Sequence, residues 1–355
     1  MASTRYQAGT ELLGLDRLVV DGYGKFIGRQ SEHIVVKEKG RVIHHAKVDD
    51  LRQVVISGSG GISFDAMELL ASQGVDLIVI SWKGEITARL ASRDMRTVQT
   101  RREQYYAYRE VRSGVLAKQF VLAKMRNQYA TLGTLAKTRK ESSPEAADKL
   151  TEKREIISTH IRQLEDVEPE PVDSIRGIVM GIEGIASAHY WDGILGIIPA
   201  DFGFNNRSGR YAEDPVNSML NYGYALLEGE VWRGVHYAGL DPYGGFLHVD
   251  RPGRPSMVLD LMEEFRQQLV DKTVIALVSR KEVAPTDFSV EEGACRMSDK
   301  ARKLLLKTVL GRFEEQLRHR DELRRWTDTI LLQARDVAAY LRGDKPSYEG
   351  FSLRW

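Results

Sequence analysis

The character of the sequence changes near residue 92, and this change constrains the fold more than any other feature. Before it, the chain consists of short runs rich in β-branched residues, such as DRLVVDG at 16–22 and VDLIVIS at 75–81, separated by glycine or charged turns. Runs of this kind predict strands of an antiparallel sheet or sandwich. After it, most segments have helical periodicity. We therefore predict an α+β fold, with an N-terminal β-rich, sandwich-like domain over 1–92 and a larger all-α domain over 93–355.

Local signals divide the β-rich part further. EKGR at 38–41 predicts a hairpin turn, and the segment 62–74 predicts a helix that Ser63 caps and that ends at Gly74 in a left-handed conformation. The segment SGSGGIS at 57–63 lies between a predicted strand and this helix, where a phosphate-binding loop would lie. The dinucleotide fingerprint requires glycine in place of Ser63, and the P-loop lysine is absent. We therefore predict a tight turn there and no nucleotide site.

Composition excludes several classes of protein. Cys295 is the single cysteine, which excludes a disulfide framework and a thiolate zinc site. Apolar residues make up 42% of the chain, enough to form sizeable cores. The N-terminus lacks the pattern of a signal peptide, and no apolar run reaches the roughly 18 residues that span a bilayer. We therefore predict a soluble, cytoplasmic protein without a membrane partner.

Positive charge is concentrated in one segment although the net charge of the whole chain is only +1. Between residues 96 and 140 eleven basic residues are opposed only by Glu103 and Glu110, and four tyrosines are interleaved among them. This local excess favours a polyphosphate partner such as DNA. The alternative is a solvated helix face whose charge is balanced in space by acidic neighbours, for which EDVEPEPVD at 165–173 is the candidate. Charge alone does not separate the two hypotheses.

Glu183 is the first candidate for a functional carboxylate. It lies in a predicted helix over 174–191, at the edge of an apolar stripe, while three glycines line the opposite face. A carboxylate at such a margin is half-buried, and a buried carboxylate needs a partner, a proton or a metal. The alternative without a functional site is that Arg176, seven residues earlier, pairs with Glu183.

A second candidate cluster lies in GFLHVDRPGRPSMVLDLMEEFR at 245–266. It contains His248 and, in a predicted helix, the carboxylates Asp260, Glu263 and Glu264. Asp260 and Glu263 are neighbours on the helix surface opposite the apolar stripe, which ordinarily means a solvated acidic face. If they form a site, imidazole and carboxylate ligands without cysteine suit Mg²⁺ or Mn²⁺, which can activate phosphoryl transfer. Spacing by itself favours the solvated face.

Four motifs in order resemble one known family: GIEGIASAHYW, DPVNSMLNYGYALL, AGLDPYGGFLH and LDLMEEFR, together with RREQYYAY and the closing LRW. The sequence resembles the CRISPR-associated adaptation endonuclease and integrase family, the "Cas-one" family, over essentially its whole length. The resemblance implies that the β-rich domain forms a homodimer and that the helical domain is catalytic. It implies a metal-dependent DNA endonuclease and integrase that inserts new spacers into a CRISPR array, with the small "Cas-two" protein as partner.

The same resemblance implies roles for individual residues. Glu183, His248 and Glu263 correspond to the metal ligands for Mg²⁺ or Mn²⁺, and Asp260 is a fourth catalytic residue that binds the metal directly or supports a ligand. DNA, as a protospacer duplex, a CRISPR repeat or a branched molecule, is expected to contact the basic surface. The candidate contacts are Arg101, Arg102, Arg176, Tyr190, Arg207 and Arg210.

Two rival hypotheses remain at this point. The same site could serve a stand-alone, structure-specific nuclease that acts on branched DNA repair intermediates. Alternatively, the chain could be a non-catalytic DNA-binding scaffold with an incidental acidic cluster. Metal-dependent cleavage of a branched duplex distinguishes both enzymes from the scaffold.

Overall fold

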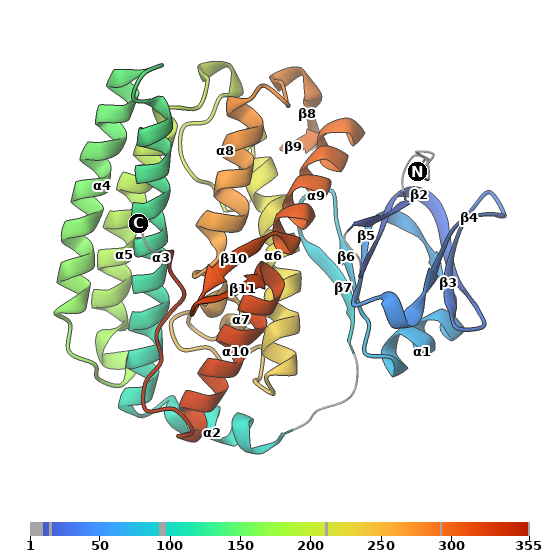
Figure 1. Cartoon of the computed structure of the whole chain (residues 1–355), viewed down its shortest axis with the longest axis horizontal. Coiled ribbons are helices and arrows are strands. Elements are labelled where there is room, and N and C mark those ends of the chain that lie inside the picture. Colours follow the sequence, from blue (N-terminus) through green and yellow to red (C-terminus); the bar gives the residue numbers. More distant parts are fainter. Residues whose placement is uncertain (1–9, 14–15, 92–96, 210–211, 292, 354–355) are drawn as a thin grey trace.

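The computed structural model describes residues 10–13, 16–91, 97–209, 212–291 and 293–353. The chain has two parts, a sheet built from residues 10–90, here called the β region, and a mainly helical part from residue 97 onward, here called the helical region (Figure 1). The predicted α+β class with an N-terminal β-rich part is therefore confirmed.

The described residues of the β region form one seven-stranded sheet, a short helix and a 3₁₀ turn at Val48–Asp50. The strand order is β4-β3-β2-β5-β6-β7, with β1 pairing onto β2. The elements are β1 (Thr10–Leu13), β2 (Arg17–Gln30), β3 (His33–Glu38), β4 (Arg41–Lys47), β5 (Gln53–Ile62), α1 (Phe64–Ser72), β6 (Asp76–Ile80) and β7 (Ile86–Leu90).

The expectation of an antiparallel sheet or sandwich is met only in part, because the β region is one mixed sheet. Strand β5 runs parallel to both β2 and β6, while the other pairs are antiparallel. Helix α1 connects β5 to β6 as a crossover, which is how parallel neighbours are joined. The apolar runs of β2, β5 and β6 therefore belong to central strands that are covered on both faces.

The prediction of a tight turn in the glycine-rich segment 57–63 is wrong. This segment is not a tight turn, because β5 continues through it to Ile62. A Cβ atom at Gly58 or Gly60 would come within 1.9 Å of the Gly22 carbonyl oxygen or 2.0 Å of the Lys25 carbonyl oxygen. These glycines therefore allow β5 to approach β2 closely where the register between the two strands shifts.

Other local predictions for the β region are confirmed. The Ser63 hydroxyl accepts a hydrogen bond from the Ala66 N–H at the start of α1, and Gly74 follows the helix with a φ of +70°. Lys39 and Gly40 have φ values of 49° and 79°, as a two-residue hairpin turn between β3 and β4 requires. Each of these signals depends only on residues within a few positions.

Alternate residues of the central strands enter two different cores. Leu18, Val54 and Leu77 face α1 and form the smaller core of the β region. Val19, Val55 and Ile78 face the opposite way and belong to the large core of the helical region. The period of two along each strand thus packs the sheet between α1 and the helices.

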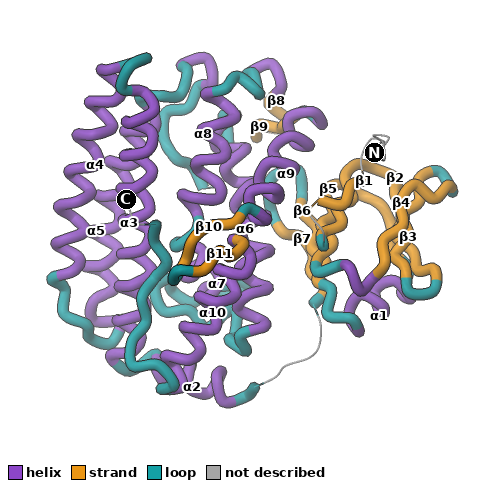
Figure 2. The backbone as a smooth tube through the Cα atoms, in the orientation of Figure 1, coloured by secondary structure: helices purple, strands orange, loops and turns teal. Residues whose placement is uncertain are grey.

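The helical region, drawn as a tube in Figure 2, is built around α6, which packs against several of the other helices and is buried along most of its length. Its α-helices are α2 (Gln99–Ala107), α3 (Val111–Arg139), α4 (Pro144–Glu165), α5 (Val172–Leu195), α6 (Pro215–Tyr237), α7 (Ser256–Met262), α8 (Lys272–Ser279), α9 (Asp299–Glu314) and α10 (Trp326–Arg342). A π-helical turn, Gln267–Asp271, joins α7 to α8, and 3₁₀ turns occur at Ala200–Phe202 and Pro285–Asp287.

The region is not entirely α-helical, which corrects the all-α prediction. Two hairpins interrupt it: β8 (Phe288–Glu291) with β9 (Ala294–Met297), and β10 (Gln316–His319) with β11 (Glu322–Arg325). Both are short and pair only with themselves. Their four-residue strands did not stand out among the helical segments in the sequence.

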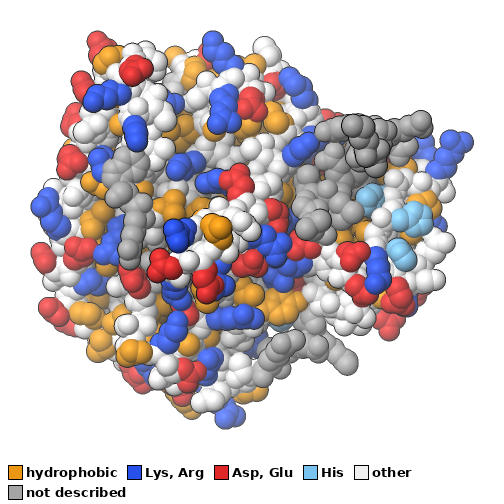
Figure 3. Space-filling model, in the orientation of Figure 1, with side chains coloured by type: hydrophobic (Ala, Val, Ile, Leu, Met, Phe, Trp, Pro, Cys, Tyr) orange, Lys and Arg blue, Asp and Glu red, His pale blue; other side chains and the backbone are white. Residues whose placement is uncertain are grey.

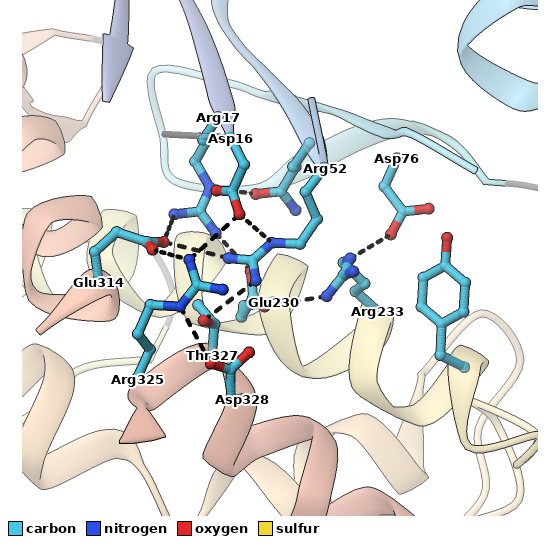
Figure 4. Close-up of polar contacts among 12 residues, drawn as sticks. Asp16, Arg17, Arg52, Asp76, Glu230, Arg233, Glu314, Arg325, Thr327 and Asp328 are labelled. Atoms are coloured by element: carbon cyan, nitrogen blue, oxygen red, sulfur yellow. Dashed lines mark hydrogen bonds and ion pairs between the residues drawn. The ribbon is translucent and has the colours of Figure 1, made fainter. Parts of the chain in front are cut away.

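A charged network joins the β region to the helical region (Figure 4). The fully buried Arg17 of β2 donates to Glu230 of α6 at 2.6 Å and to Glu314 of α9 at 3.1 Å. Arg52, just before β5, reaches the same Glu314 oxygen at 3.2 Å, and Arg325 reaches its other oxygen at 3.1 Å. Buried charges of both signs are therefore matched across the junction.

The surface shows no segregation of charge on the face that Figure 3 presents, where acidic and basic side chains are interspersed. Histidines gather on the β region in that view, and the rings of His33 and His45 on β3 and β4 lie 6.5 Å apart. None of the helices within the described residues has the length and hydropathy needed to cross a bilayer.

Candidate functional site

Glu183 lies in the middle of α5 and is directed toward α3. Its Oε1 accepts a hydrogen bond from the Ser187 hydroxyl at 2.6 Å, one turn later in the same helix, and lies 2.7 Å from the Lys124 ammonium. Arg176, the partner that the sequence offered, binds elsewhere. The carboxylate is therefore paired with Lys124, and 19% of its side chain remains exposed.

Glu263 comes from the end of α7 and meets the same ammonium. Its Oε2 lies 2.8 Å from Lys124 Nζ, and its Oε1 accepts a hydrogen bond from Arg266 Nε at 3.1 Å. Burial alone would raise the pKa of Glu263, but Arg266, Lys124 and His248 together lower it to about 2. Glu183 and Glu263, far apart in the sequence, thus converge on one cation position.

Asp260 is fully buried and holds His248 in place. Its two oxygens accept the backbone N–H groups of Phe246, Leu247 and His248 at 2.6, 2.9 and 3.0 Å. The same carboxylate contacts His248 Nδ1 at 2.6 Å. This contact engages Nδ1 and leaves Nε2 as the nitrogen available to another partner. A carboxylate in this arrangement fixes the ring orientation and tautomer of a metal-binding histidine.

The segment before His248 is fixed from its other side as well. Arg176 of α5 donates to the carbonyl of Phe246 at 3.0 Å and to that of Leu247 at 3.1 Å. A Cβ atom at Gly245 would come within 2.6 Å of the Ser256 side chain, so glycine is needed there for the segment to pack against α7. Arg176, predicted to contact DNA, therefore orients the histidine segment in this structure.

Glu264 points away from the other two carboxylates of its cluster. It is fully buried, and its oxygens accept hydrogen bonds from the Tyr348 hydroxyl, from Gln333 Nε2 at 3.0 Å and from the Phe351 N–H at 2.9 Å. Burial raises its pKa to about 7, although these donors partly oppose the shift. Glu264 thus anchors the C-terminal segment onto the helix that carries Asp260 and Glu263.

A buried polar group follows in the π-helical turn after α7. Asp271 accepts hydrogen bonds from the hydroxyl groups of Tyr190 at 3.0 Å and Tyr224 at 2.5 Å. Tyr190, predicted to contact DNA, is fully buried, so it supports the protein core rather than a surface. Burial raises the pKa of Asp271 to about 6, while the two tyrosines and the nearby Arg207 and Arg266 oppose this rise.

Asp271 is expected to make stability depend on pH. Because its folded pKa of about 6 exceeds its ordinary value of 3.8, the folded state holds the proton more tightly, and this contribution is lost as pH rises from about 4 through 6. The loss is about 3 kcal/mol. Asp271→Asn should remove this pH-dependent contribution. In urea titrations, the difference in unfolding free energy between wild type and variant should therefore decrease as pH rises from 4 to 7. The exposed Asp201→Asn is the control, and a difference independent of pH would contradict the assignment.

The predicted basic contacts differ in their surroundings. Arg207 donates to Asn217 at 3.0 Å and to Asn221 at 2.7 Å, and its guanidinium lies 5.1 Å from the centre of the Tyr224 ring. Arg102 is exposed and Arg101 is partly buried on α2. Arg210 lies outside the described residues. None of these geometries by itself identifies a partner.

The proposed balance between the 96–140 segment and the acidic 165–173 stretch exists only in part. Arg126 pairs with Glu165 at 2.7 Å, and Lys118 donates to the carbonyl groups of Glu165 and Val167. Lys124 instead enters the carboxylate cluster. The basic side chains of this segment therefore have different kinds of partner, which the number of charges alone could not distinguish.

A cavity of about 1000 Å³ adjoins His248. It lies between the turn after β6 and the helical region, and its lining includes Arg207, Arg251, Arg254 and Arg266 as well as His248. Sequence reasoning missed Arg251, Arg254 and Arg266. The signal was present, since the first two arginines follow His248 in HVDRPGRP and the third follows Glu263 by one helical turn.

The chemistry of these side chains fits a divalent cation. Within the described part of the chain, no three His, Cys, Asp or Glu residues already surround one position as a metal site would. Lys124 stands between Glu183 and Glu263 instead. However, the buried Glu263 Oε2 receives no hydrogen bond of normal geometry despite the nearby ammonium. Two carboxylates and an oriented imidazole form a donor set suited to Mg²⁺ or Mn²⁺.

Comparison with known proteins adds an independent line of evidence. The family model described as CRISPR associated protein Cas1 matches residues 18–310. A CRISPR-associated endonuclease Cas1 of Archaeoglobus fulgidus is 47% identical over 345 residues, covering 96% of this chain and all of the relative. A CRISPR-associated protein Cas1 of Methanobrevibacter ruminantium is 33% identical over 342 residues, again covering 96% of this chain and all of the relative.

Solved structures share the fold. A casposase bound to its integration product superimposes with a TM-score of 0.80 at 24% identity, covering 94% of this chain and 92% of that chain. A Cas1 protein from Thermotoga maritima gives a TM-score of 0.77 at 18% identity, covering 96% of this chain and all of that one. The arrangement of a β region followed by helices therefore recurs in proteins of low sequence identity.

Proposed function

Because the chain belongs to the Cas1 family of CRISPR-associated proteins, we propose that it is a metal-dependent DNA endonuclease and integrase that inserts new spacers into a CRISPR array. The observation that carries this proposal is the meeting of Glu183 and Glu263 at one cation position close to the tethered His248. The basic cavity next to His248 supports it, because a phosphodiester substrate is anionic.

Glu183, Glu263 and Nε2 of His248 would hold one Mg²⁺ or Mn²⁺. When bound, such an ion supplies Lewis-acid stabilisation of a phosphoryl oxygen. Asp260 keeps the imidazole in one tautomer, and Ser187 keeps the Glu183 carboxylate oriented through its 2.6 Å hydrogen bond. Both supports are independent of any ion, so the ligands are positioned before the substrate arrives.

The remaining side chains of the site would bind DNA and orient its reacting groups. Arg207, Arg251 and Arg266 line the cavity and can offset the charge of a phosphodiester during transfer. The nucleophile for integration is the 3′-hydroxyl of an incoming DNA end, and water in its place gives cleavage. Arg101 and Arg102 of α2 would add backbone contacts that do not depend on sequence.

The assembly that we propose is a homodimer joined through the β region, with the Cas-two protein as a further partner. Exposed apolar side chains on β2 and β4 support this role, with Tyr23, Phe26 and Val42 exposed by 56%, 43% and 42%. Strand β4 is also an edge of the sheet, and edges need protection. About a third (37%) of one chain in a solved Cas6-RT-Cas1–Cas2 complex superimposes on this chain at 19% identity, with a TM-score of 0.80.

A strand-transfer assay tests the proposed function. Duplex DNA with labelled 3′-hydroxyl ends is incubated with Mn²⁺ and a supercoiled plasmid that carries a CRISPR repeat. We expect label to become covalently joined to the plasmid, and we expect 3′-deoxy ends to abolish joining because the nucleophile is missing. Hydrolysed fragments without joined product would favour the stand-alone branched-DNA nuclease instead.

Asp260→Asn is expected to lower strand transfer by roughly 10- to 100-fold. Both carboxylate oxygens accept N–H donors, so an amide NH₂ in either position faces a donor and releases the histidine segment. Saturating Mn²⁺ should restore part of the activity, because the ligands themselves remain. Asp250→Asn, at an exposed position nearby, is the matched control. Wild-type turnover of Asp260→Asn at every Mn²⁺ concentration would exclude a role for Asp260 in positioning His248.

A further inference from the structure

We propose that Lys124 competes with the divalent cation for the two carboxylates and thereby couples metal loading to DNA binding. The inference rests on the proposed function, since it concerns the same site. It starts from the ammonium of Lys124, which lies 2.7 Å from Glu183 Oε1 and 2.8 Å from Glu263 Oε2. Both oxygens belong to the carboxylates that would hold the metal ion, so the ammonium would compete with the ion for them.

The charges of the cluster support this competition. Three carboxylates, those of Glu183, Glu263 and Asp260, face two cationic side chains, Lys124 and Arg266, which leaves one negative charge. A divalent cation that takes the place of the ammonium adds two positive charges, while the displaced ammonium stays tethered to α3 beside the cluster, so the partly buried site then has one excess positive charge. A phosphodiester then returns the total to zero. Metal and DNA phosphate should therefore stabilise each other's binding.

The surroundings of Lys124 allow its side chain to leave without a change of fold. Its ammonium is carried on a flexible four-carbon chain from α3, and 17% of the side chain is exposed. Glu183 keeps its hydrogen bond from Ser187 when the ammonium departs, and Gln128 of α3 in turn donates to the Ser187 hydroxyl at 3.0 Å. Glu263 keeps Arg266. The carboxylates thus remain oriented for an ion.

The first consequence concerns affinity for metal without DNA. Lys124→Met removes the competing cation and leaves a nearly equal volume. We expect it to bind Mn²⁺ at least tenfold more tightly than wild type in calorimetric titrations, with free Mn²⁺ followed in parallel by electron paramagnetic resonance. Metal-free Lys124→Met should also melt at a lower temperature than wild type, because two carboxylates lose a partner, and Mn²⁺ should raise its Tm more than that of wild type.

The second consequence concerns coupling. A duplex with 3′-deoxy ends, which cannot be joined, should strengthen Mn²⁺ binding by wild type about tenfold and by Lys124→Met much less. Lys118→Met is the matched control, because Lys118 lies on the same helix and contacts backbone carbonyls instead of the cluster. It should behave as wild type. If Lys124→Met folds poorly, the same titrations can be made with Lys124→Gln, whose side chain is polar and uncharged.

The outcomes separate this inference from the function on which it rests. Equal or weaker Mn²⁺ binding by both Lys124 variants, with normal binding by wild type, would overturn the competition and leave the metal site standing. Absence of Mn²⁺ binding in every protein, with and without DNA, would overturn the metal site itself and the inference with it. Equal coupling to DNA in wild type and Lys124→Met would overturn the link between Lys124 and metal loading.

Discussion

His248→Ala is expected to lower strand transfer and cleavage by roughly 10³-fold or more, about 4 kcal/mol of transition-state stabilisation. The imidazole is the single nitrogen donor in the cluster, and Asp260 holds it through Nδ1. Its loss would leave only the two carboxylates as ligands, and both are paired with Lys124. DNA binding should change by about twofold or less, since backbone contacts to basic side chains supply most of the affinity.

The experiment pairs a gel-shift titration with the strand-transfer assay on the same preparation. His160→Ala on α4, outside the carboxylate cluster, is the matched control and should retain both activities. Circular dichroism and melting temperature establish that the His248 variant is folded. A parallel loss of binding and turnover would mean that His248 serves the structure of the 245–255 segment and not the reaction.

Arg17→Met is expected to cause the largest loss of stability, about 3–5 kcal/mol in the free energy of unfolding. Glu230 is buried together with Arg17, and burial by itself would raise its pKa. Arg17, followed by Arg52 and Arg233, outweighs that effect and lowers it. Without Arg17, the Glu230 carboxylate keeps only Arg233, at 3.7 Å, as an ion-pair partner among the described residues. The expected loss is therefore that of an uncompensated buried charge.

Urea unfolding followed by tryptophan fluorescence measures this effect. Arg324→Met is the matched control, because its partner Glu322 is 64% exposed and a surface pair contributes about 1 kcal/mol or less. The network joins β2 to α6 and α9, so Arg17→Met should also increase the overall rate of protease cleavage of the chain. Equal losses in the two variants would show that the buried network contributes no more than a surface pair.

Local elements of the fold followed from the sequence because their causes are local. The Ser63 cap, the left-handed Gly74 and the Lys39–Gly40 turn each depend on atoms within about five residues. The glycines at 58 and 60 had a different cause, the approach of β5 to a strand some 35 residues earlier in the chain. No local pattern distinguishes that requirement from a turn, and the prediction failed there.

The candidate site shows the same division. Motif resemblance proposed Glu183, His248, Asp260 and Glu263 as site residues, while helix periodicity alone favoured a solvated acidic face. In the structure Asp260 and Glu264 are fully buried, and each has a full set of donors from other segments. Lys124 counted only as one of many basic residues in the sequence. Its partners belong to α5 and α7, and nothing within its own helix indicates them.

The sequence by itself determined the periodicity of the strands and helices, the caps and turns, the absence of a disulfide framework and the family to which the chain belongs. Each depends on residue identity or on neighbours along the chain. The tertiary structure alone decided which charges are buried and with what they pair: Lys124 between two carboxylates, Asp260 beneath the histidine, and Arg17 between β2 and α6. The physical reason is that the cost of burying a charge depends on which surfaces meet, and those surfaces are brought together by the packing of the whole molecule.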